Sequence, residues 1–262
     1  MYSCEYARPQ SVADAAQAIA DGGQALAGGQ TLIATMKQRL AAPATLVDLS
    51  QIADLKGIRV DGDNVVIGAM VCHADVAESE VVRQHIPALA ELAGGIGDRQ
   101  VRARGTLGGS VANNDPAACY PSAVLALGAT VITDQRQIAA DDFFQGMYAT
   151  ALEPGELILA ISFPKPQAAA YAKFKQQASR FALVGVFVAK TAGGVRVAVT
   201  GAGTEGVFRS AALEQALNAE CSAASAAAVA VPADGLNSDI HGTAEYRAHI
   251  IGVMAQRAVA SL

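Results

Sequence analysis

The chain has 262 residues, of which 52% are hydrophobic and 16% are charged, so it is long enough to bury a sizeable core in more than one domain. Its formal net charge of −5 gives no electrostatic reason to expect a nucleic-acid partner. Its longest small or apolar run, residues 223–231, is far shorter than the roughly 20 residues that span a bilayer, and its first residues lack the basic cluster and apolar core of a signal peptide.

The first part of the chain combines short strands, helices and a paired-glycine loop. Residues 2–7 predict a strand, and Ser11 as N-cap begins a helix that ends at residues 22–23. Residues 24–27 predict a brief strand leading into the loop, and from Thr31 apolar residues recur at helical spacing. Strand, glycine loop and helix N-terminus in this order suit an anion-binding site. An ordinary strand-to-helix turn is an equally good reading of this segment taken alone.

The next segment carries two histidines. Residues 45–48 and 64–69 predict strands, and a helical stretch extends over residues 72–92. His73 and His85 are candidate catalytic bases by residue type. Neither has a neighbouring carboxylate or a motif, so we interpret both as structural or surface residues.

A second paired-glycine segment follows later in the chain. Residues 104–110 read Arg-Gly-Thr-Leu-Gly-Gly-Ser, and small polar residues, Asp115 and an apolar helix over residues 121–127 come next. Glycine has no Cβ, so such a backbone can approach an anionic ligand closely with its amides turned outward. We interpret residues 27–32 and 106–110 as two loops that meet on one dinucleotide.

Three arginines precede the second glycine pair. Arg99, Arg102 and Arg104 lie within six residues. They can neutralise a pyrophosphate, or they can face a partner subunit. A solvated basic turn with carboxylate partners nearby is the third reading, and the sequence leaves all three open.

The rest of the chain divides at a pair of prolines. Residues 130–133 and 137–139 predict a hairpin, and residues 157–163 predict a strand. The segment Pro164-Lys165-Pro166 is stiff and interrupts a β segment, so it marks a domain boundary. Beyond it come three predicted strands and three alanine-rich helices, over residues 171–175, 183–190, 195–200, 209–217, 222–230 and 244–261.

Together these segments resemble the medium, FAD-binding subunit of the molybdenum hydroxylases, the family of xanthine dehydrogenase and aerobic carbon monoxide dehydrogenase. Each glycine pair alone is weak evidence, whereas both pairs in this order with these flanking residues are highly specific. The resemblance covers essentially the whole chain. It rests on residues 27–32, 36–40, 100–110 and 115–118, with support from residues 174–176, 179–180, 201–203 and 208–211.

The resemblance implies an α+β fold. Family members have a two-lobed FAD-binding region of the p-cresol methylhydroxylase (PCMH) and vanillyl-alcohol-oxidase-like type, followed by a C-terminal domain with a three-stranded antiparallel sheet and a helical bundle. On this chain the expected divisions are residues 1–55 for the first FAD-binding lobe, 56–166 for the second and 167–262 for the C-terminal α+β domain. A Rossmann fold is not expected, because no G-x-G-x-x-G follows a strand.

The resemblance also assigns the cofactor-binding residues. Backbone amides of the two glycine loops are expected to wrap the diphosphate and ribityl of FAD. Lys175 can offset phosphate or reduced-flavin charge, and an ordinary exposed lysine on a strand is the alternative reading. Two residues depart from the family: Cys119 stands where an aspartate is usual, and Phe181 stands where carbon monoxide dehydrogenases tend to have tyrosine. The expected set is Ala27, Gly28, Gly29, Gln30, Thr31, Leu32, Ile96, Thr106, Leu107, Gly108, Gly109, Ser110, Cys119, Leu159 and Lys175.

The function that the resemblance implies is that of an oxidoreductase subunit. The chain is expected to accept electrons from two [2Fe–2S] clusters of a small subunit and pass them from FAD to an external acceptor, while a large subunit holds the molybdopterin cofactor. We expect a dimer of heterotrimers in the cytoplasm. No catalytic side chain and no metal site is expected in this chain, because the flavin carries the chemistry and the four cysteines are scattered.

Two other functions remain open from the sequence. A self-sufficient flavin oxidase or reductase of the same fold needs acid–base residues, or a histidine or cysteine linked to the flavin, and none lies beside either glycine loop. A structural subunit that has lost the flavin is the other alternative. Cys119 is the best argument for it, whereas both intact glycine loops argue against it.

Overall fold

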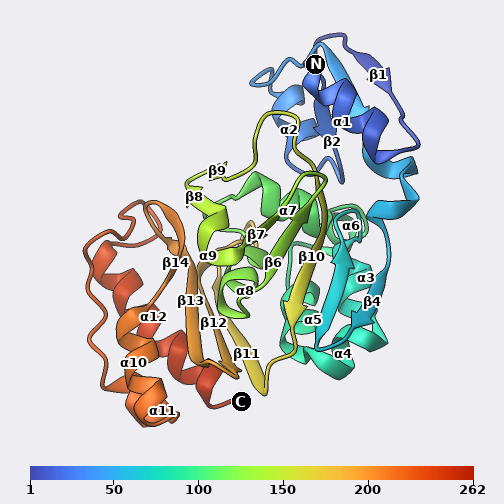
Figure 1. The fold of residues 1–262 in the computed structure, drawn as a ribbon. Helices are drawn as coiled ribbons and strands as arrows, with labels where there is room; N and C mark the ends of the chain where they lie inside the picture. Colours follow the sequence, from blue (N-terminus) through green and yellow to red (C-terminus); the bar gives the residue numbers. More distant parts are fainter.

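The computed structural model describes residues 1–262, and its first sheet lies in the N-terminal part of the chain (Figure 1). This parallel sheet has the strand order β1-β3-β2. Ala15 on a helix and Val47 on the central strand are fully buried in one apolar cluster, so the helix packs on the sheet. The first strand is shorter than predicted because its partner offers paired residues only from Thr45 onward. The elements are β1 (Glu5–Ala7), α1 (Val12–Ala20), β2 (Gln24–Leu26), α2 (Leu32–Lys37) and β3 (Thr45–Asp48).

The second sheet has five antiparallel strands in the order β4-β5-β10-β6-β7. Its strands are β4 (Ile58–Asp61), β5 (Asn64–Gly68), β6 (Thr130–Thr133), β7 (Gln137–Ala139) and β10 (Ile158–Pro164). Although β10 comes last in the sequence, it lies at the centre, with Ile161 paired to Ile67 of β5 and to Val131 of β6. The chain therefore returns to complete this sheet with a strand that ends at Pro164, the first residue of the proline pair.

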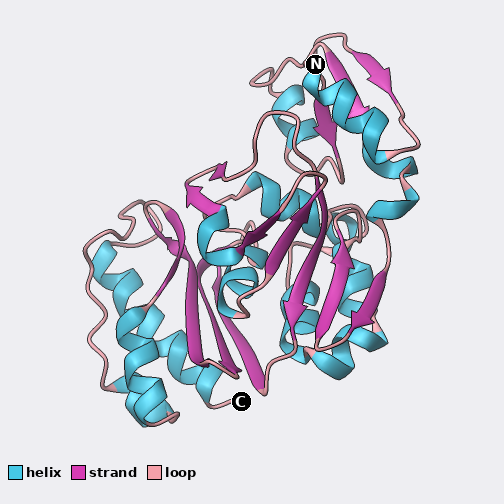
Figure 2. Ribbon diagram, in the orientation of Figure 1, coloured by secondary structure: helices cyan, strands magenta, loops and turns pink.

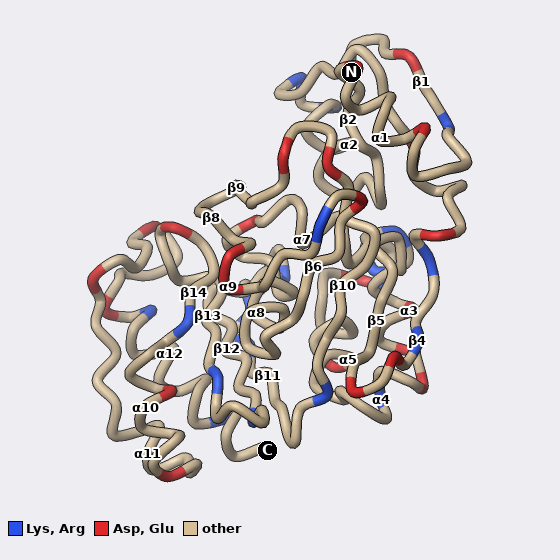
Figure 3. Tube along the Cα trace, in the orientation of Figure 1, with Lys and Arg blue, Asp and Glu red and all other residues tan.

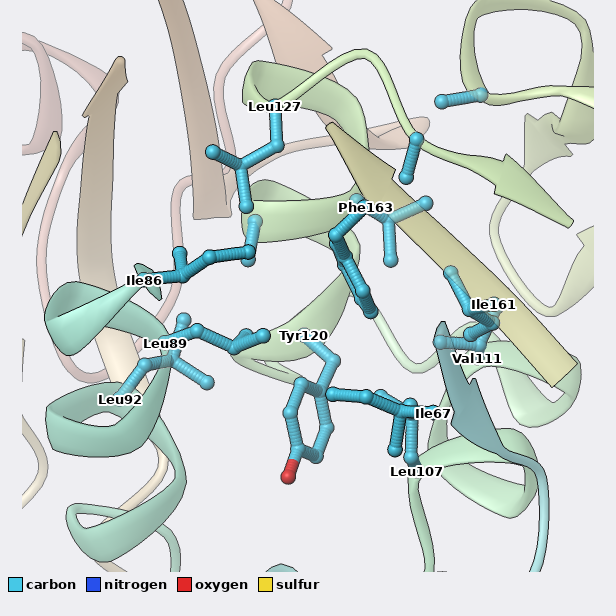
Figure 4. Packing of buried hydrophobic residues seen from close by; sticks show 14 of the residues in the cluster. Ile67, Ile86, Leu89, Leu92, Leu107, Val111, Tyr120, Leu127, Ile161 and Phe163 are labelled. Carbon is cyan, nitrogen blue, oxygen red and sulfur yellow. The ribbon is translucent and has the colours of Figure 1, made fainter. Parts of the chain in front are cut away.

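Helices and a small hairpin fill the long connections of the second sheet and share its core. Tyr120 and Phe163 are fully buried there, and Figure 4 shows Tyr120 lying among Leu89, Ile67 and other apolar side chains. The elements are α3 (His73–Glu78), α4 (Glu80–His85), α5 (Pro87–Gly94), α6 (Arg99–Arg102), α7 (Leu107–Asn113), α8 (Tyr120–Ala126), α9 (Ala140–Phe143), β8 (Phe144–Gly146) and β9 (Ala149–Thr150). The five-stranded sheet and the helices in its connections therefore share one large apolar core.

The second glycine pair lies inside helix α7 and not in an open loop, which the sequence did not predict. Glycine lowers helix stability by about 1 kcal/mol relative to alanine, so local propensity favours a loop. Thr106 offsets this as the N-cap, its hydroxyl accepting a hydrogen bond from the Gly109 amide at 3.1 Å. Gly108 lies against Ala69, and a Cβ added to it would come 2.5 Å from the Ala69 Cβ. Close packing therefore requires glycine at this point of the helix.

The third sheet is antiparallel, with the order β11-β12-β13-β14. Three long strands match those that the family resemblance implies, and the short β14 adds a fourth. The first strand begins earlier than predicted because Ala168 already pairs with Lys190. The elements are β11 (Ala168–Lys175), β12 (Ala182–Thr191), β13 (Gly194–Gly203), β14 (Gly206–Arg209), α10 (Ala211–Ala219), α11 (Ala223–Ala227) and α12 (Ala244–Val259).

Both faces of the third sheet are buried. Val184 and Val186 of β12 belong to the cluster that includes α12, whereas Phe187 and Ala189 belong to the core of the second sheet. Figure 2 shows the sheet between the C-terminal helices and the rest of the chain. The nearly continuous apolar run over residues 183–190 thus reflects a strand buried on both sides.

Glu156 is a buried carboxylate just before β10, the central strand of the second sheet. Arg136 donates to it from Nε and Nη2 at 3.0 Å each, and the Thr133 hydroxyl donates at 2.7 Å. The Glu156 side chain is fully buried, whereas Arg136 is 44% exposed. The guanidinium hydrogen bonds hold the pKa of Glu156 at about 2, below its ordinary value of 4.5.

Glu156→Gln is expected to remove a pH-dependent part of the stability. Because the folded pKa is lowered, the contribution is present above pH 4.5 and is lost as the pH falls through about 2. We expect the free energy of unfolding of the natural chain to fall by about 1–2 kcal/mol more than that of the variant, a value reduced for the exposure of Arg136. Urea unfolding across this pH range measures the difference, and parallel pH profiles would contradict the expectation.

Charged residues are mixed over the surface of the molecule. Figure 3 shows Lys and Arg positions interspersed with Asp and Glu, without a single basic stripe. Proteins that bind nucleic acid usually present such a stripe or patch. None of the helices is both long enough and apolar enough to cross a membrane.

Candidate functional site

The two paired-glycine segments lie against one another. Gly28 packs on the backbone of the second segment, because a Cβ added to it would come 2.8 Å from the Gly105 Cα and even closer to the Arg104 carbonyl oxygen. Gly109 faces the first segment, where an added Cβ would come 3.3 Å from the Ala27 Cβ. The two segments therefore contact each other, as the sequence predicts.

The first segment presents a row of unpaired amides. The backbone N–H groups of Gly28, Gly29, Gln30 and Thr31 donate to no acceptor in the chain. Gly29 has a φ of +70°, a left-handed conformation that glycine adopts without strain. The Gln30 side chain turns back to the Gly28 carbonyl at 3.1 Å and leaves the amides free. Successive unpaired amides around a left-handed residue form the concave arrangement that binds anions.

The second segment uses most of its amides inside the chain, contrary to the expectation that both loops offer amides to the cofactor. The Leu107 amide donates to the Val71 carbonyl at 3.0 Å, and the Gly108 amide donates to the Ala69 carbonyl at 2.8 Å. The amides of Gly109 and Ser110 donate to the Thr106 hydroxyl and carbonyl, each at 3.1 Å. The Leu107 side chain is buried in the core. The Ser110 hydroxyl is half-buried and makes no hydrogen bond in the chain. This segment therefore contributes close backbone approach and a hydroxyl, while the first segment contributes amides.

Lys173 joins three segments beside Ile96. Its Nζ donates to the carbonyl oxygens of Gly95 at 2.6 Å and Arg180 at 3.3 Å, and lies 3.5 Å from the Sγ of Cys119. Cys119 is 5% exposed and stands at the start of α8. The loop after α5, the start of α8 and the turn after β11 are thus fastened together by one ammonium group.

The arginines ahead of the second segment have separate roles. Arg102 donates from Nη1 to the carbonyl oxygens of Ile96 at 2.9 Å and Gly97 at 3.3 Å. Arg99 and Arg104 are exposed, and none of the three arginines forms an ion pair with a carboxylate. The exposure of Arg99 and Arg104 fits the reading of a solvated turn, whereas the carboxylate partners of that reading are absent. The backbone carbonyl of Arg104 lies against Gly28.

His73 is a structural residue, as its sequence context indicates. It is 5% exposed, and its ring lies 5.2 Å from that of Tyr120. Burial lowers the pKa of His73 to about 4, so the ring is neutral near pH 7. A Cβ added to Gly105 would come 2.5 Å from the His73 Nε2, so the imidazole packs directly against the second glycine segment.

Comparison with known proteins identifies the family. A family model described as "FAD binding domain in molybdopterin dehydrogenase" matches residues 2–166. The chain is 38% identical to the carbon monoxide dehydrogenase medium chain of Afipia carboxidovorans, over 98% of this chain and 96% of that protein. The chain belongs to the FAD-binding medium subunits of the molybdenum hydroxylases.

Other relatives of this medium subunit carry names that refer to different compounds. The nicotine 6-hydroxylase medium subunit of Paenarthrobacter nicotinovorans is 36% identical, over 97% of this chain and 95% of that protein. The structure of quinoline 2-oxidoreductase from Pseudomonas putida 86 contains a chain with 29% identity and a TM-score of 0.90, covering 99% of this chain and 96% of that one. These likenesses confirm the α+β fold and the oxidoreductase class.

The medium subunit brings most of its predicted site residues together. Leu159 is linked to the second glycine segment by Ala69. The Ala69 amide donates to the Leu159 carbonyl at 2.9 Å, and the Ala69 carbonyl accepts from the Gly108 amide. Lys175 is exposed at the end of β11, and its side chain makes no hydrogen bond. The residues that lie in or beside the two segments are Ala27, Gly28, Gly29, Gln30, Thr31, Leu32, Thr106, Leu107, Gly108, Gly109, Ser110 and Leu159, while Ile96 and Cys119 flank Lys173.

Lys175, an expected site residue, lies two residues beyond Lys173, whose contacts within the chain were not predicted. Both residues follow the alternation of β11, but the pairing with β12 shifts between Phe174 and Lys175. This bulge takes Lys175 away from the face that Tyr171 and Lys173 share. The alternation of Tyr171 with Lys173 next to an apolar opposite face was the available signal. Phe181, where a tyrosine was noted in related enzymes, is 49% exposed beside the turn that Lys173 holds.

Proposed function

We propose that this chain holds FAD across its two glycine segments, accepts electrons from the [2Fe–2S] clusters of a small partner subunit and passes them to an external acceptor. The observation that carries the proposal is the row of unpaired amides over Gly28–Thr31, placed directly against Gly105 and Gly109. The family assignment supports the choice of FAD as the ligand.

The residues present fit the diphosphate of FAD. Four unpaired amides supply donors for phosphate oxygens. Glycine at positions 28 and 109 lets the two segments approach each other more closely than residues with a Cβ would allow. Ile96 and Leu159 are half-buried apolar residues available to the rest of the cofactor. Bound FAD supplies the electron transfer, and the chain positions it and adjusts its electrostatic surroundings.

The partners and the division of the chain belong to the same proposal. We expect a large subunit with the molybdopterin cofactor, a small subunit with two [2Fe–2S] clusters, a dimer of such heterotrimers and a cytoplasmic location. The medium-chain names of the relatives support the first two expectations. The three sheets support domains over residues 1–55, 56–166 and 167–262, with the family model ending at the second boundary.

Purification of the affinity-tagged chain from its native cells tests the proposal. We expect two further subunits to copurify, with molybdenum, iron and FAD in the ratio of one pterin cofactor, two clusters and one flavin. A flavin-containing chain without molybdenum and iron would favour a self-sufficient flavin enzyme instead. A copurified complex that lacks flavin would favour the structural subunit and would contradict the proposal.

A further inference from the structure

We propose that His73 is a positioning residue for the FAD site, whose imidazole ring sets the position of the Gly105 backbone on which Gly28 rests and thereby the separation of the two glycine segments. The inference rests on the proposed function, because it concerns the affinity for the FAD that the chain is proposed to hold. It gives a role in binding to a buried side chain that lies outside both glycine segments.

The His73 ring packs against the Cα of Gly105. A Cβ added to Gly105 would come 2.5 Å from the Nε2 of the ring and 2.8 Å from its Cδ2. The His73 amide also donates to the Gly105 carbonyl at 2.9 Å, and the neighbouring Cys72 forms an isolated antiparallel bridge with Thr106. The main chain and the side chain at position 73 therefore both hold Gly105 in place.

Gly105 is in turn the surface on which the first glycine segment rests. A Cβ added to Gly28 would come 2.8 Å from the Gly105 Cα, and the Gly28 amide is the first of the four unpaired N–H groups. Neither glycine has a left-handed backbone conformation, so the missing Cβ at both positions serves close approach and not an unusual φ. Two direct packing contacts, His73 on Gly105 and Gly105 on Gly28, therefore connect the ring to an unpaired amide.

The His73 ring is confined and uncharged. It lies 5.2 Å from the ring of the fully buried Tyr120. Burial and the nearby Arg102 charge lower the pKa of His73 to about 4, so the ring influences Gly105 at neutral pH by contact and not by charge. Its Nδ1 is buried without a hydrogen-bond partner in the chain, which costs free energy that an apolar side chain would avoid. Stability of the fold alone therefore does not favour histidine at this position.

Two single substitutions disturb the spacing in opposite directions. His73→Ala leaves a space beneath Gly105, whereas Gly105→Ala places a Cβ in the volume that the ring occupies. Each is expected to lower the affinity for FAD about tenfold. In the double variant the added Cβ takes the space left by the ring, and its next contact is the Val101 carbonyl oxygen at 3.1 Å. We expect the double variant to recover to within about threefold of the natural affinity.

Fluorescence titration of the flavin-free full chain with FAD measures the dissociation constants of the natural chain and the three variants. The titrations are made at a temperature at which thermal unfolding shows every variant to be folded. Met254→Ala is the control for lost stability, because Met254 is buried on α12 in the separate apolar cluster of the third sheet. This variant is expected to unfold at a lower temperature and to bind FAD as the natural chain does.

Three results would overturn the inference. If His73→Ala is less stable but binds FAD with the natural affinity, the ring serves only the fold. A double variant that binds no better than Gly105→Ala would show that the ring and the added Cβ do not compete for one space. An equal loss of affinity in Met254→Ala would show that binding follows general stability. A natural chain that takes up no FAD is a different result, because it removes the proposed function together with this inference.

Discussion

Gly28→Ala is expected to lower the affinity of the chain for FAD by about ten- to hundredfold. The added Cβ would meet the Arg104 carbonyl oxygen and the Gly105 Cα, which are backbone atoms that no side-chain rotation can move. Relief requires the two glycine segments to separate. Overpacking of this kind costs about 1–3 kcal/mol, and each 1.4 kcal/mol corresponds to a tenfold change in affinity.

Fluorescence titration of the flavin-free chain measures this effect, with thermal unfolding as the check on folding. Gly109→Ala gives a graded comparison, because its Cβ would meet the Thr106 hydroxyl at 2.8 Å and the Ala27 Cβ at 3.3 Å. Gly252→Ala in α12 is the matched control, since its added Cβ has no atom within 4 Å. Equal FAD affinity in the Gly28 and Gly252 variants would show that the contact between the segments does not shape the site.

Arg247→Leu is expected to lower the free energy of unfolding by about 2–4 kcal/mol. Arg247 lies on α12 and is only 3% exposed. Its Nη1 donates to the carbonyl oxygens of Leu183 at 2.9 Å and Gly201 at 3.0 Å, and its Nη2 pairs with Asp239 at 2.8 Å. Leucine fills part of the space but leaves these acceptors without their donor, so α12 loses its polar attachment to the third sheet.

Arg257→Leu provides the control for this change. Arg257 lies on the same helix but is exposed and forms no ion pair. In urea unfolding we expect Arg247→Leu to show most of the predicted loss in the free energy of unfolding, whereas Arg257→Leu shows little. If both variants unfold at the same denaturant concentration, the buried guanidinium is not what attaches α12 to the sheet.

Much of the fold follows from local patterns in the sequence. Ser11 caps α1 as predicted, because its hydroxyl accepts from the Asp14 amide, and the strands over residues 45–48 and 130–133 have the predicted bounds. Short strands β4 and β14 were not predicted, because each lies at the edge of its sheet and pairs with a single neighbour. Their existence depends on a long neighbouring strand that offers hydrogen bonds.

The contact between the two glycine segments was predictable from the sequence, but the different use of their backbone amides was not. The glycine pairs identify two segments that approach something closely, and the structure shows that they also approach each other. Local propensity could not reveal that Gly108 and Gly109 lie inside a helix, since packing on Ala69 decides that conformation. The bulge after Phe174, which separates Lys173 from Lys175, likewise depends on pairing with a strand several residues away.

The most direct measurement is a titration of the purified, flavin-free chain with FAD, followed by gel filtration and a visible absorbance spectrum of the protein peak. We predict that one FAD remains with each chain, and that Gly28→Ala reduces this retention while Gly252→Ala does not. A natural chain that stays colourless, or one whose retained FAD is unaffected by Gly28→Ala, would contradict FAD binding between the two glycine segments.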